Sequence, residues 1–172
     1  MKQLIMALAL LVAFSAPGSA HKFEKDGIVI KHPWTRATAQ GAAVGVGYLA
    51  ITNNGKEPDK LTGGTFDGAD NVEIHEMKMD GDKMLMRQLK DGLEIKPGET
   101  VKLSPGGYHL MFVGLKKPIA QGPNIKGSLT FEKAGSVDVT YKVESLGAMK
   151  SSDADHSGMK MDDTEMKHDH AQ

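Results

Sequence analysis

Turn-forming residues divide the chain between residues 23 and 143 into short segments, and this feature restricts the fold more than any other. The turn signals are NNG at 53–55, DG at 80–81, KPGE at 96–99, SPGG at 104–107 and KAGS at 133–136. The segments between these turns are rich in Val, Ile, Leu and Thr. After residue 20, no segment keeps a helical period of apolar residues over about 11 positions. Many short strands at this spacing predict an all-β antiparallel sandwich or barrel.

The predicted strands cover 27–31, 44–52, 60–65, 72–79, 84–89, 101–103, 109–113, 128–132 and 137–143. A body of about 120 residues can bury one hydrophobic core but is too short for two domains. The sequence therefore predicts a single β domain over residues 21–146. Trp34, the only tryptophan, is expected in its core.

The first 20 residues are typical of a secretory signal peptide. Lys2 gives a positive start, residues 4–14 form an apolar run, and residues 18–20 are small. The run is too short to span a bilayer comfortably, and no later segment is longer and equally apolar. We expect cleavage before His21, export to the periplasm, and neither membrane insertion nor a lipid anchor in the mature protein. A buried N-terminal helix is the alternative.

The chain contains no cysteine. This excludes structural zinc of the Cys type, iron–sulfur clusters, thiol catalysis and a cysteine-ligated blue-copper centre. A formal net charge of −1 gives no basis for predicting nucleic-acid binding. Any soft-metal chemistry must therefore depend on methionine thioethers and histidine imidazoles.

Four of the methionines lie close together in the segment IHEMKMDGDKMLM, residues 74–86. An Asp80-Gly81 turn of type I′ would make residues 72–89 a hairpin in which His75 faces Met86. Alternation then places His75, Met77, Met84 and Met86 on one face, while Val72, Ile74 and Leu85 take the other. A two-residue slip would keep this face but change the facing partners.

A second cluster follows in the segment PGGYHLMFVGL. His109 and Met111 share one face of a strand, while Leu110 and Phe112 take the opposite face. Thioethers suit Cu(I), and imidazole suits copper in either oxidation state. We therefore predict that the two strands converge on one copper ion. The alternative is that the methionines fill gaps in the core and the histidines lie on the surface.

The last 26 residues, 147–172, contain no Ile, Leu, Val, Phe, Tyr or Trp. Such a segment cannot bury enough apolar surface to offset the entropy of ordering, so we expect a disordered tail. Its potential copper ligands are Met149, His156, Met159, Met161, Met166, His168 and His170. The tail is either a second, weaker copper site that also accepts Cu(II), or an incidental polar extension.

The chain resembles the periplasmic copper chaperones of the PCu(A)C family. That family's pattern is a His, ten residues, a Met, about twenty-one residues, and His-x-Met. His75 and Met86 have this spacing, and 22 residues separate Met86 from the His109-Leu110-Met111 triplet, one more than usual. The segments HPWTRAT, GVGYLAITNNG, EIHEM and PGGYHLMFVGLKKP extend the resemblance over residues 34–143.

This resemblance implies a cupredoxin-like antiparallel β-sandwich of Greek-key type with a Cu(I) site near its surface. The implied ligands are His75, Met86, His109 and Met111, with Met77 as a flanking group. The implied role is to carry copper in the periplasm toward the copper centres of cytochrome c oxidase, sometimes with Sco-type proteins. We expect a monomer with the oxidase subunit or a Sco-type protein as its copper acceptor.

Two other functions remain open on sequence grounds. A copper buffer or resistance protein would use the tail to sequester Cu(I) and Cu(II). A copper oxidoreductase would need a histidine brace, in which the α-amino group and imidazole of His21 combine with a second imidazole such as His32. We predict that the protein binds copper and does not catalyse a reaction.

Overall fold

The structure is a computed structural model that describes residues 22–151 of the chain. Every regular element in this range is a strand, as predicted. The strands are β1 (Lys22–Lys25), β2 (Ile28–Arg36), β3 (Val44–Asn53), β4 (Asp59–Phe66), β5 (Asn71–Asp80), β6 (Lys83–Gln88), β7 (Leu93–Ile95), β8 (Thr100–Leu103), β9 (His109–Val113), β10 (Ile125–Phe131) and β11 (Gly135–Glu144). The sequence missed the short strands β1 and β7.

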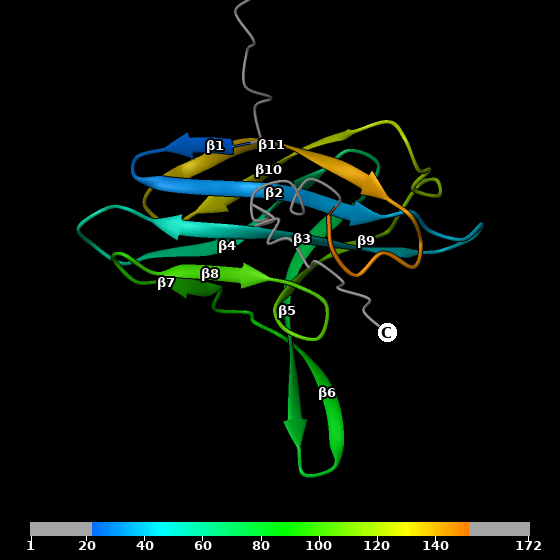
Figure 1. Cartoon of the computed structure of the whole chain (residues 1–172), viewed down its shortest axis with the longest axis horizontal. Helices are drawn as coiled ribbons and strands as arrows, with labels where there is room; N and C mark the ends of the chain where they lie inside the picture. Colours follow the sequence, from blue (N-terminus) through cyan, green and yellow to red (C-terminus); the bar gives the residue numbers. More distant parts are fainter. Residues whose placement is uncertain (1–21, 152–172) are drawn as a thin grey trace, which may run out of the picture.

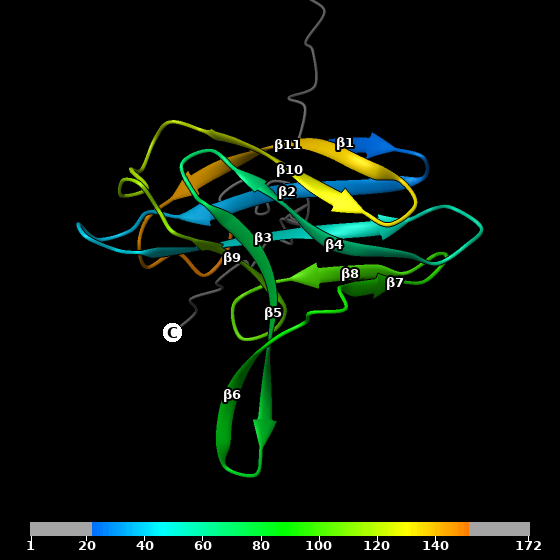
Figure 2. The same cartoon turned by 180° about the vertical axis from the view of Figure 1, so that it is seen from behind.

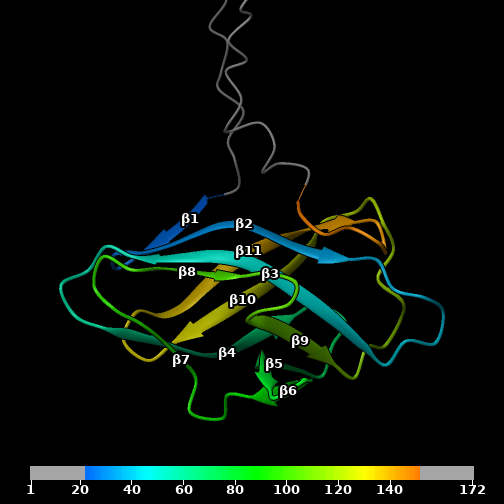
Figure 3. The same ribbon diagram turned by 60° about the horizontal axis from the view of Figure 1, so that its bottom comes forward.

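The strands form two packed layers (Figures 1 and 3). Their order along the sheet is β6-β5-β9-β3-β2-β11-β10-β4-β7, and β1 and β8 add to β2 and β3. Strand β11 pairs along its length with β10 and, through Lys142–Glu144, in parallel with β2. It therefore links the layer that contains β2 to the layer that contains β10 and β4. The fold is the cupredoxin-like β-sandwich expected from the resemblance.

Three aromatic rings join the two layers at the centre of the core. Phe66 of β4 stacks on Phe112 of β9 with ring centroids 3.8 Å apart, and Tyr141 of β11 meets both rings edge-on. A Cβ atom at Gly47 of β3 would collide with the Phe112 ring. Glycine at this position therefore makes room for Phe112, which fixes β9 against β3 and β4.

The outer face of the β2–β3–β9–β5 layer continues across all four strands. Trp34 lies opposite Tyr48, Val46 opposite Met111, and His75 opposite His109. Trp34 is buried as expected, at 6% exposed, but it packs on Tyr48 at 4.6 Å between ring centroids, outside the main core cluster.

The chain leaves the sandwich on this same outer face. Arg36, whose guanidinium lies 5.5 Å from the centre of the Tyr48 ring, donates from Nε to the carbonyl of Ala148 at 2.6 Å. Its Nη2 also contacts the sulfur of Met149 at 3.4 Å. The first residues of the predicted tail, 147–151, are thus described, and Met149 lies among them.

The remaining terminal predictions fall outside the described range. The predicted signal peptide, His21 and the tail residues His156, Met159, Met161, Met166, His168 and His170 belong to 1–21 and 152–172. Between residues 22 and 151, no helix is long and apolar enough to cross a membrane.

Candidate metal centre

Strands β5 and β9 bring two histidines together on the outer face of the sandwich. In the antiparallel pairing, His75 lies opposite His109 and Glu73 lies opposite Met111. Directly opposed residues share a face, so these four side chains project on one side. Ile74 and Leu110 occupy the other side and are buried in the core. The predicted convergence of the two clusters is therefore present.

The two imidazole rings are close and almost fully buried. Their centroids are 5.7 Å apart, and His75 and His109 are 8% and 6% exposed. Burial lowers the pKa of His109, and the nearby His75 lowers it further, while a hydrogen bond with Gly107 opposes the shift. The lowered pKa favours the neutral form of His109, which is the state in which imidazole binds metal.

Hydrogen bonds determine which ring nitrogens are free. His75 Nε2 lies 2.8 Å from a carboxylate oxygen of Glu73, and His109 Nδ1 lies 3.2 Å from the carbonyl of Gly107. A carboxylate and a carbonyl only accept, so both nitrogens donate. In neutral rings, the lone pairs then remain on Nδ1 of His75 and Nε2 of His109.

The free nitrogen of His75 fits a metal ligand. Its Nδ1 is buried and has no hydrogen-bond partner among the described residues. Buried polar atoms are nearly always paired, so an unpaired one requires an explanation. Metal-binding histidines usually donate their other N–H to a carboxylate or carbonyl, as both histidines do here.

The predicted register of the hairpin is wrong by two residues. Met77 faces Met86, Met79 faces Met84, and His75 faces Gln88 rather than Met86. The two loop residues are Gly81 and Asp82, and the positive φ falls on Gly81 but not on Asp82. Glycine in the first loop position is typical of a type II′ turn, whereas the prediction assumed an Asp-Gly turn of type I′.

The shift keeps the predicted face but changes the neighbours of each sulfur. Met86 is now diagonal to His75, at a Cα separation of about 7–8 Å that a long side chain can span. It lies directly opposite Met77. Met111 and Met77 are half-buried, while Met86 is 52% exposed. All four predicted ligands therefore share one face. Met77, two residues from His75 on β5, is about as near to the histidines as Met86 on β6.

The donor set selects for soft metals. Within residues 22–151, no group of three or more His, Cys, Asp or Glu side chains is arranged to hold a metal ion. The other potential soft ligands on this face are the thioethers of Met77, Met86 and Met111, and a combination of imidazole and thioether suits Cu(I). Glu73, which sequence reasoning missed, orients His75; its position two residues before His75, on the same strand face, was the available signal.

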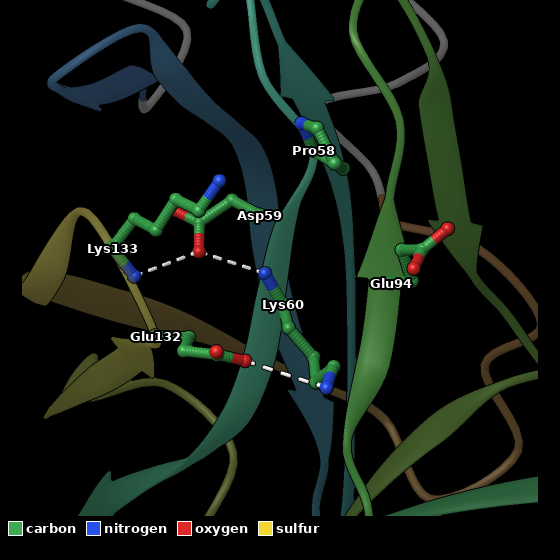
Figure 4. A pocket seen from close by; sticks show the side chains of 6 residues that line it. All are labelled: Pro58, Asp59, Lys60, Glu94, Glu132 and Lys133. Atoms are coloured by element: carbon green, nitrogen blue, oxygen red, sulfur yellow. Dashed lines mark hydrogen bonds and ion pairs between the residues drawn. The ribbon is translucent and has the colours of Figure 1, made fainter.

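A separate cavity of about 210 Å³ lies beside Asp59 and shares no residue with the histidine and methionine cluster (Figure 4). The Asp59 carboxylate accepts from the backbone N–H groups of Lys60, Lys133 and Ala134 at 2.7–3.0 Å. Burial raises the pKa of Asp59, but these three donors and the positive charge of Lys133 together outweigh it, and the net shift is downward. The carboxylate holds the β10–β11 turn against β4, which is a structural role.

Of the two residues considered for a histidine brace, only His32 is described. It lies at an irregularity in the pairing of β2 with β3 and has a φ of 50°. Its partner in that hypothesis, His21, precedes the described range.

Sequence comparisons match this chain to one family and one curated relative. The family model described as "Putative lipoprotein LpqE-like" matches residues 28–143. A protein of Leifsonia xyli subsp. xyli, named "Putative lipoprotein Lxx21020", is 28% identical over 138 residues, which are 80% of each chain.

Solved structures with the same fold include PCuAC domains with and without copper. The apo PCuAC domain of PmoF2 is 28% identical with a TM-score of 0.64, covering 76% of this chain and 100% of that one. The copper-bound form is 29% identical with a TM-score of 0.62, covering 73% and 98%. The Cu(I) form of DR1885 from Deinococcus radiodurans is 25% identical with a TM-score of 0.51, covering 66% and 75%.

Proposed function

Because the chain belongs to the LpqE-like family of PCuAC domains, we propose that it is an exported copper chaperone. The cargo is one Cu(I) ion, bound by His75, His109, Met111 and Met86. The observation that carries this proposal is the buried histidine pair, in which each ring has one nitrogen held by an acceptor and the other free.

The two kinds of ligand contribute differently. The imidazoles are held in place before metal arrives, which lowers the cost of ordering the site on binding. Thioethers are neutral and have no ionisable proton, so they release or accept copper without a protonation step. Four neutral ligands leave the bound Cu(I) with a single positive charge, which is tolerable near the surface.

We propose that the acceptor is a copper centre of cytochrome c oxidase, reached directly or through a Sco-type protein. The test is to load the protein with one equivalent of Cu(I) without oxygen, mix it with a purified apo copper domain of the oxidase, and separate the two. Copper should move to the oxidase domain. If copper stays with this protein although the oxidase domain binds it more tightly, the result would instead indicate a buffer.

The composition of the last 26 residues keeps the buffer function as a second candidate. This segment carries histidines and methionines in place of apolar residues. A buffer would bind several copper ions and protect against copper excess without a specific acceptor. An oxidoreductase would turn over with reductant and oxygen, and we expect no such turnover.

The site of action proposed here is the periplasm, because residues 1–20 have the features of a signal peptide. The matched family and the matched curated protein are both named as putative lipoproteins, which indicates export of these relatives. N-terminal sequencing of the exported protein tests the proposed start at His21.

A further inference from the structure

The end of the β5–β6 hairpin carries a pair of methionines that the site described above does not use. Met79 and Met84 lie directly opposite each other, one pair before the turn. Both are 55% exposed. The hairpin projects away from the sandwich, so no other strand of residues 22–151 lies beside its end (Figures 1 and 2). We call Met79 and Met84 the tip pair.

Burial among the described residues does not explain the apolar side chains of the tip pair. Apolar side chains are placed in cores because burial stabilises them, and these two remain more than half exposed. Residues next to the turn, Asp80, Asp82 and Lys83, are charged, as expected of a solvated hairpin end. What distinguishes the tip pair from a polar pair is the sulfur, which is a soft metal ligand.

The register aligns the tip pair with the histidine site. From the turn inward, the facing pairs on this side are Met79 with Met84, then Met77 with Met86, then His75 with Gln88, and His75 also faces His109. Residues two apart on a strand share a face and are about 6.5–7 Å apart. Thioethers thus occur at each step between the exposed end of the hairpin and the buried imidazoles.

We infer that the tip pair is a second Cu(I) site, through which copper enters and leaves the histidine site by way of Met77 and Met86. This rests on the proposed copper function. Each step along the hairpin exchanges one copper–sulfur bond for another, and the last step replaces copper–sulfur bonds with copper–nitrogen bonds to the neutral imidazoles. The copper therefore stays Cu(I), and no proton or electron is transferred. Two exposed neutral thioethers without an imidazole bind more weakly than the histidine site, so the tip pair fills after it at equilibrium.

The test compares the whole protein with its Met79→Leu/Met84→Leu variant, in which side-chain size is nearly conserved. In a control, Leu85→Met is added to that variant, which returns a thioether to the hairpin on its opposite face. Uptake of Cu(I) from a chromophoric chelator is followed without oxygen. We expect the double variant to take up copper several-fold more slowly, while the equilibrium affinity of the histidine site stays unchanged. In the control, the added Leu85→Met change should not restore the uptake rate. Equal uptake rates, or recovery in the control, would overturn the inference.

Methyl-labelled methionine gives a direct readout by NMR. The first equivalent of Cu(I) should shift Met111 and Met86, and the second should shift the methyl groups of Met79 and Met84. If the histidine site fills and the tip-pair methyl signals do not move, this inference fails while the proposed function stands. If the first equivalent leaves the methyl signals of Met111 and Met86 unchanged, the proposed function itself fails.

Discussion

The two halves of the candidate copper site differ in how firmly they are held. The histidine pair on β5 and β9 is 8% and 6% exposed, and each ring is fixed by a hydrogen bond. Three of the four methionines of the β5–β6 hairpin are exposed, with Met86 at 52%, and Met77 is half-buried. A flexible methionine loses rotamer freedom when a metal orders it, whereas a buried ring has already lost it.

This difference indicates a division of roles. In the proposed function, the prearranged histidine pair would contribute most of the affinity, because little ordering remains to be done when copper binds. The exposed thioethers would give partners access to the ion. The following predictions test this division, from the largest expected effect on Cu(I) binding to the smallest.

Removal of a histidine should have the largest effect. His109→Ala should weaken Cu(I) binding by more than about 100-fold, because even loss of a ligand's hydrogen-bonding partner typically costs 10–100-fold. Competition with a chromophoric chelator measures this, and His32→Ala serves as the control. Equal losses in the two variants would contradict the assignment of the histidine pair.

Removal of the group that orients His75 should have the next largest effect. Glu73→Ala should cost about 10–100-fold in Cu(I) affinity, and Glu73→Gln, which keeps an acceptor oxygen, should cost less. In the apo protein, nitrogen NMR should show the proton of His75 on Nε2, and this preference should weaken in Glu73→Ala.

The matched control for Glu73 is Glu76→Gln. Glu76 lies next to His75 on the same strand, but it points to the opposite side and pairs with Arg87. It should leave both the affinity and the His75 tautomer unchanged. An effect as large as that of Glu73→Ala would mean that charge, rather than orientation, matters.

Loss of an exposed thioether should have a moderate effect. Met86→Leu should weaken Cu(I) binding by less than His109→Ala and change the free energy of unfolding by less than about 1.5 kcal/mol, as for volume-conserving swaps. Met77→Leu should also weaken binding, since Met77 faces Met86. A large loss of stability in Met86→Leu, measured by thermal unfolding, would favour a packing role.

Acidification should separate the two halves of the site. Both imidazoles must be neutral to bind copper, and a free imidazole titrates near about 6.5. Burial lowers the pKa of His109. Protons therefore compete only weakly with copper for this imidazole until the pH falls below about 6.5. Affinity should therefore hold from pH 8 to about 6.5 and then decline, leaving weak thioether binding. Unchanged affinity at pH 5 would argue against histidine ligation.

The same shift affects the stability of the apo protein. With a lowered pKa in the folded state, His109 binds fewer protons than it does in the unfolded chain. Its contribution to stability is complete above about pH 6.5 and is lost as the pH falls through that value toward the folded pKa. Thermal unfolding across this range measures the loss.

Truncation should have the smallest effect on the histidine site. A chain that ends at Ser151 should still bind one Cu(I) with unchanged affinity, because all four proposed ligands precede that residue. It should lose any additional copper, Cu(II) included, that the full chain binds. Metal analysis of both forms measures the difference; equal stoichiometry would make the tail irrelevant to copper binding.

Alternation along strands allowed much of this site to be predicted. The turn signals located most strands, and the two-residue period placed His109 and Met111 opposite the core-facing Leu110. The pairing of β5 with β9 was harder to predict from the sequence, because it joins segments more than 30 residues apart that no local pattern links.

The hairpin register could not be fixed from composition. Asp80-Gly81 and Gly81-Asp82 are both acceptable two-residue loops, and the choice depends on which residue takes the positive φ. The hydrogen bond from Arg36 to Ala148 could not be predicted from the sequence either, because the two residues are 112 positions apart and only the folded sheet brings them together.

The position of that hydrogen bond determines how far the first potential metal ligand of the tail, Met149, lies from the site. Arg36 shares the outer face with Val46, which lies opposite Met111, so about two strand spacings, or 10 Å, separate Arg36 from Met111. The sulfur of Met149 contacts Arg36 Nη2 at 3.4 Å, so this thioether is held at a similarly short range from the copper face. Its local concentration there is set by the fold, whatever the protein concentration around it.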